Sequence, residues 1–188
     1  VEKLLSLYLR FSDQDLLILL PRIKEFILDM KYPDMIIEKL DLFRNQILHS
    51  SANGFYGVDS LTQTIVEICL YKKMGNIAQK NLDLIYDDTN AYHIALQAQI
   101  YSLQETMAAH DALCNLVQRL QEGSRLKLIC EICFLYLKMK LLLAKSAKKY
   151  GEKLINNELY SKYLEYTYLL RNYAELSDDN EECKQLYN

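Results

Sequence analysis

Few residues in this chain can end a helix, since it has only five glycines and two prolines in 188 residues. Leu, Ile, Lys, Glu and Gln are common, and all of them are compatible with helices. Apolar residues recur at helical spacing, as Ile36, Leu40, Phe43 and Ile47 do, and no segment shows the sustained alternation of a strand. A sandwich or barrel would need more turn residues. The sequence therefore predicts an all-α fold.

Breaks in the periodicity suggest how the chain is organised. The segment SSANGFYGVDS at 50–60 holds two of the five glycines, so we expect a loop there. This loop would separate an N-terminal helical subregion, 1–49, from a helical-hairpin array, 61–188. In the array we expect Gly75 to end one helix, and a break near 103–106 that neither Gly nor Pro marks.

Two unusually long segments, 126–150 and 152–175, close the array and are separated by Gly151. Each would form a helix about 36 Å long, and we expect them to pack as an antiparallel pair. Most of the first segment's circumference is apolar, which is typical of a helix surrounded by other helices. Its charges form one narrow polar seam and recur too often for a bilayer helix. The seam comprises Lys127, Glu131, Lys138, Lys145 and Lys149.

Cys130 and Cys133 form a Cys-x-x-Cys motif inside this apolar segment. A structural zinc site needs a second ligand pair at motif spacing, and the sequence has none. A redox pair normally lies at a helix N-terminus, where the dipole lowers the thiol pKa. We therefore expect both cysteines to be core residues.

An Asp-Asp-x-x-Glu string at 178–182 resembles the magnesium-diphosphate motif of all-α isoprenoid synthases. No second metal-binding motif accompanies it, and acidic residues after Ser177 are explained by helix capping and the helix dipole. An all-α enzyme would need magnesium-dependent chemistry at Asp178 and Asp179. We assign no catalytic, cofactor-binding or metal-binding residue.

An internal period of 30 to 35 residues links four tyrosines, at 71, 101, 136 and 168. An alanine follows each tyrosine, at 78, 108, 144 and 174. This period is similar to that of tetratricopeptide-type helical hairpins, and the resemblance covers 61–186. It implies antiparallel hairpins stacked into a superhelical array that holds a partner polypeptide. The last two helices are longer than the standard unit.

Lysines form a dense run at 138–153 and tyrosines are concentrated in the last 40 residues, and both suggest a binding surface. Tyrosine rings bury a large area at low entropic cost, whereas a lysine run can also be a solvated face paired with nearby glutamates. Tyr160, Tyr163 and Tyr166 lie toward the apolar side of their segment, where we expect them to pack in or beside the core. The candidate partner-binding residues are Lys138, Lys145, Lys148, Lys149, Lys153, Tyr168 and Tyr187.

These features favour a non-enzymatic scaffold or adaptor, a fragment of a larger helical-repeat protein that binds a peptide or helical segment of another protein. The alternative is a closed helical bundle of regulatory type that binds an amphipathic helix or a lipid. A net charge of −3 argues against nucleic acid, and no motif suggests a small-molecule substrate. The sequence has no candidate transmembrane segment. Five cysteines without a signal peptide favour an intracellular protein, cytoplasmic or nuclear.

Overall fold

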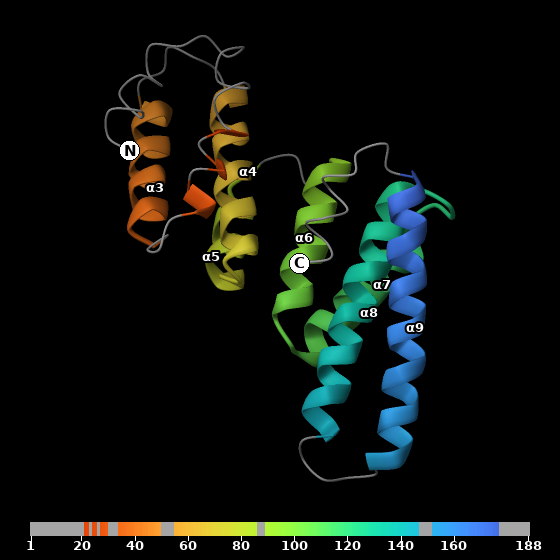
Figure 1. Ribbon diagram of the computed structural model, residues 1–188. Coiled ribbons are helices and arrows are strands. Elements are labelled where there is room, and N and C mark those ends of the chain that lie inside the picture. Colours follow the sequence, from red (N-terminus) through yellow and green to blue (C-terminus); the bar gives the residue numbers. More distant parts are fainter. Residues whose placement is uncertain are drawn as a thin grey trace. The chain divides into compact units, whose positions relative to one another are not determined.

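The structure, a computed structural model, is all-α over the residues that it describes (Figure 1). These residues contain helices and turns and no strand, which confirms the predicted fold class. The expected first helix at 2–10 and the expected final helix after Ser177 lie outside them. The described residues are 21–22, 24–25, 27–29, 34–49, 55–85, 89–146 and 152–176.

The chain divides into two compact units, Val1–Asp88 and Thr89–Asn188. In the first unit, α3 spans Asp34–His49, α4 spans Phe55–Tyr71 and α5 spans Gly75–Leu82. The start of α4 lies inside the loop expected at 50–60, so that prediction is wrong from residue 55 onward. A glycine inside a helix costs only about 1 kcal/mol relative to alanine, and the burial of Leu61, Ile65 and Ile68 in α4 can outweigh this cost.

Lys73, not Gly75, provides the left-handed residue that ends α4. Its φ is 59°, the Met74 amide donates to the Cys69 carbonyl at 2.7 Å, and the Lys73 amide donates to the Leu70 carbonyl at 3.0 Å. This pair of hydrogen bonds is the Schellman pattern of a helix C-terminus. Gly75 instead begins α5.

The core of the first unit lies around α4, which contacts both α3 and α5. Leu40 of α3, Ile65 of α4 and Leu82 of α5 are fully buried. A polar pair also connects α3 to α5, because the buried guanidinium of Arg44 donates to Asn81 Oδ1 at 2.5 Å.

The second unit contains α6 (Ala91–Leu103), α7 (Met107–Arg119), α8 (Arg125–Ser146) and α9 (Glu152–Leu176). The predicted break at 103–106 is confirmed. The Thr106 hydroxyl accepts a hydrogen bond from the Ala109 amide at 3.2 Å, which caps α7, and the Asn90 side chain caps α6 in the same way.

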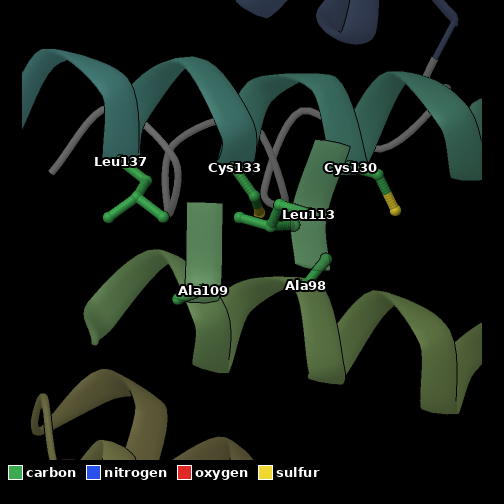
Figure 2. Close-up of a cluster of buried hydrophobic side chains, with 6 residues drawn as sticks. All are labelled: Ala98, Ala109, Leu113, Cys130, Cys133 and Leu137. Atoms are coloured by element: carbon green, nitrogen blue, oxygen red, sulfur yellow. The ribbon is translucent and has the colours of Figure 1, made fainter. Parts of the chain in front are cut away.

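Helix α8 is the centre of the second unit, in contact with α6, α7 and α9. Cys130, Cys133 and Leu137 point from α8 toward α6 and α7, where Ala98 and Leu113 complete the cluster (Figure 2). On another side of α8, the antiparallel helix α9 packs along it (Figure 1). The sequence predictions of a surrounded helix, core cysteines and a long antiparallel pair are thus confirmed.

Candidate protein-binding surface

Over residues 157–171, where its side chains are described, helix α9 packs on α8 through one face. Leu170 is buried against Leu128 and Ile132 of α8, and Tyr166 and Leu169 are half-buried at the same contact. A helix of 25 residues is about 37 Å long, so this contact places a long, nearly straight element at the edge of the second unit. The side chains on the opposite side of α9 are free of this contact.

The opposite side carries large side chains in a regular row. Tyr160, Leu164 and Tyr168 are 65%, 50% and 63% exposed, and each follows the last by four residues. At 100° per residue they fall within about 80° of one another, together with the exposed residues Asn157 and Arg171. We call these five residues the outer face of α9.

The apolar area of the outer face is large for a single helix. With roughly 200 Å² for each large side chain, the three exposed fractions correspond to about 350 Å². The largest apolar patch on a typical monomer measures about 300–600 Å² and is often functional. Tyr163, 54% exposed, borders this area.

Two of the sequence expectations for α9 are wrong. Tyr160 and Tyr163 were expected to pack in or beside the core with Tyr166, but both are exposed and only Tyr166 is half-buried. The buried face is centred between Tyr166 and Leu170, and Tyr160 lies about 100° around the helix from that centre. Sequence reasoning therefore missed Tyr160 and Leu164, and their four-residue spacing with Tyr168 was the signal that could have identified them.

Tyr136 and Lys140 of α8 make a series of aromatic and polar contacts with Tyr166 of α9 and with Glu105. The rings of Tyr136 and Tyr166 lie 6.3 Å apart, and the Lys140 ammonium lies 5.1 Å from the Tyr136 ring centroid. Lys140 also donates to Glu105 at 2.7 Å. Burial alone would lower the pKa of Lys140, but the hydrogen bonds and charges of Glu105 and Tyr136 together outweigh burial and raise the pKa. This lysine is thus held by a structural ion pair.

The polar seam of α8 is buried at its N-terminal end. Lys127 is only 8% exposed, and its ammonium forms an ion pair with Glu122. Burial raises the pKa of Glu131, the charge of Lys127 lowers it, and the charges of Glu122 and Glu165 raise it further. The first turns of the seam are therefore part of the packed structure, and the solvated stretch lies farther along α8.

The candidate residues named from the sequence fall into two groups. Lys138 is half-buried and Lys145 is exposed, both on α8, and Tyr168 is exposed on α9. Lys153 lies in α9, but its side chain is not among those described. Lys148, Lys149 and Tyr187 lie outside the described residues. Among those with a described side chain, Tyr168 is the one on the outer face of α9.

The cysteine motif has the environment of a packed core. Burial raises the pKa of Cys130 to about 11, and burial together with the neighbouring thiol raises the pKa of Cys133 to about 12. Thiols with such values are protonated at neutral pH and are poor nucleophiles. Within the described residues, no three His, Cys, Asp or Glu side chains lie close enough together to hold a metal ion.

Comparison of the chain with protein-family models, curated proteins and solved structures gives no match. In the part of the chain that the structure describes, no helix combines the length and the apolar character needed to cross a membrane.

Proposed function

We propose that this chain is a non-enzymatic protein-interaction module and that it binds a helical segment of another polypeptide chain through the outer face of α9. One observation carries the proposal: α9 has large apolar side chains on two opposite sides, and α8 covers only one of them. The spacing of four residues between the large side chains of this row suits a partner helix, because such a helix presents its own apolar side chains at the same spacing. Tyrosine is also among the residues enriched at binding hot spots.

The proposed module is a scaffold or adaptor subunit built from helical hairpins, and we propose that it is a fragment of a larger helical-repeat protein. Two short hairpins, α4 with α5 and α6 with α7, precede the long pair in the chain and support this architecture. Cys114, Cys130 and Cys133 are free thiols, in keeping with the proposed cytoplasmic or nuclear location.

Site-specific photocross-linking tests the proposal. A p-benzoylphenylalanine at position 168 should yield cross-linked products that contain a second polypeptide, and Leu164→Asp should remove them. The control places the same group at position 111, on α7, where the native side chain is 71% exposed. Equal yields from positions 168 and 111, or products that persist in the Leu164→Asp variant, would overturn the proposed role of α9.

A further inference from the structure

We infer that the polypeptide bound by the outer face of α9 is a second copy of this chain, packed antiparallel about a two-fold axis that passes beside Leu164. This inference rests on the proposed function and names the partner for the same surface. It follows from the symmetry of the residues on that face, from their charges and from the area that they expose.

The outer face has the same pattern in both directions along the helix. Taking Leu164 as the centre, tyrosines lie four residues before and after it, at 160 and 168. Asn157 and Arg171, both exposed polar residues, lie seven residues before and after. A two-fold interface needs a surface that is complementary to itself. In an antiparallel pair, Leu164 meets its own copy and Tyr160 meets Tyr168.

The charges on this face favour the antiparallel direction. In an antiparallel pair, Arg171 lies opposite the amide of Asn157 and one position from Glu158, which is exposed. In a parallel pair, each Arg171 would instead face the Arg171 of the other copy, and like charges at such a position are unfavourable. Glu165 lies outside the row and forms an ion pair with Lys162 at 2.7 Å.

The exposed area sets the expected strength of the pair. Two outer faces would bury about 700 Å² of apolar surface, and the flanking polar residues bring the total to about 1,000 Å² or slightly more. This lies at the lower limit for a specific interface. We therefore expect a dimer that dissociates over a micromolar concentration range.

Sedimentation equilibrium of the full chain measures the association directly. The unaltered chain should shift from monomer to dimer with rising concentration, and Leu164→Asp should raise the dissociation constant at least about 30-fold. Leu143→Asp is a matched control, because Leu143 is 52% exposed on α8 and Leu164 is 50% exposed on α9. It should leave the dissociation constant unchanged. A monomer at every concentration, or equal effects of the two variants, would overturn the inference.

Engineered cysteines test the two-fold axis separately, in a chain that carries Cys114→Ser and Cys183→Ser. Helices packed 8–10 Å apart, with a Cα radius of about 2.3 Å, place facing Cα atoms about 3.4–5.4 Å apart, and the upper part of this range suits a disulfide. Leu164→Cys should therefore form a disulfide-linked dimer in the presence of oxidised glutathione. Asn157→Cys should not, because its two copies would lie about 21 Å apart along the axis.

A mixture of two single variants fixes the direction. Asn157→Cys mixed with Arg171→Cys should give a mixed disulfide in the antiparallel pair. Dimers of Asn157→Cys alone, without the mixed product, would indicate a parallel pair and overturn the inference. If the chain is monomeric but position 168 cross-links to a different protein, the inference that the partner is a second copy is wrong and the proposed function stands. If position 168 also gives no cross-link, both are wrong.

Discussion

Truncation of Leu137 to alanine tests the central position of α8 in the second unit. Leu137 is fully buried in the cluster with Ala98 and Leu113. The substitution removes three carbon atoms, each worth about 0.8 kcal/mol of transfer free energy, and the residual cavity adds to this loss. We expect the free energy of unfolding to fall by about 3–4 kcal/mol.

Leu143→Ala is the matched control, since it makes the same chemical change on the same helix. Leu143 is 52% exposed, so its truncation should change the free energy of unfolding by no more than about 0.5 kcal/mol. Helix propensity changes equally in the two variants, and their difference therefore measures burial alone.

Urea unfolding followed by circular dichroism gives both free energies, and thermal unfolding provides a second measurement. For a chain of this size, a loss of about 3 kcal/mol corresponds to a melting temperature lower by about 6–12 °C. If the two compact units unfold separately, only the transition of the unit containing α8 should move. Similar losses for the two variants, or a loss below about 1 kcal/mol for Leu137→Ala, would refute the assignment of Leu137 to the core.

Three further predictions concern buried polar and ionisable groups. Arg44→Met should lower the free energy of unfolding by about 1–3 kcal/mol, because it leaves Asn81 Oδ1 buried without its donor. A double-mutant cycle with Asn81→Leu, measured by urea unfolding, should show that the two losses are coupled. Additive losses would contradict an interaction between the two side chains. Burial raises the pKa of Glu131, so its contribution to stability grows as the pH falls and is lost as the pH rises through the folded-state pKa. Glu131→Gln should therefore raise the urea midpoint at pH 7 and lose this advantage near pH 4, whereas an equal gain at both would be contrary evidence. In the native chain at pH 8, iodoacetamide should modify Cys114 well before Cys133, whose pKa is about 12; mass spectrometry that finds equal rates would disprove the difference in burial.

The helical spacing of apolar residues in the sequence predicted those features of the fold that are set within one helix. The apolar positions of α8 repeat at helical spacing around most of its circumference, and Leu128, Ile132 and Leu137 are all buried. The break before α7 was also predictable, although neither Gly nor Pro marks it. Thr106 supplies the hydroxyl that caps the new helix, and capping residues are recognisable in sequence.

Helix ends depend on backbone geometry that composition does not specify. The glycine-containing segment after residue 50 suggested a loop, yet α4 begins at Phe55 and includes Gly57. Gly75 was expected to end α4, but Lys73 adopts the left-handed conformation there. A glycine permits a turn without requiring one, so the positions of the glycines alone do not locate the two ends of α4.

The exposure of the outer face of α9 could not be predicted from the periodicity of that helix alone. Periodicity locates each side chain around its own helix, but it does not say which side a neighbouring helix will cover when both sides carry large apolar groups. Packing against α8 settled this in favour of Leu170 and left Tyr160, Leu164 and Tyr168 exposed. At about 25 cal/mol per Å², their roughly 350 Å² represents about 9 kcal/mol of burial free energy that the folded chain alone does not gain. Because exposed side chains contribute little to folding, the fold does not account for the apolar character of this row, whereas a second helix bound on it would.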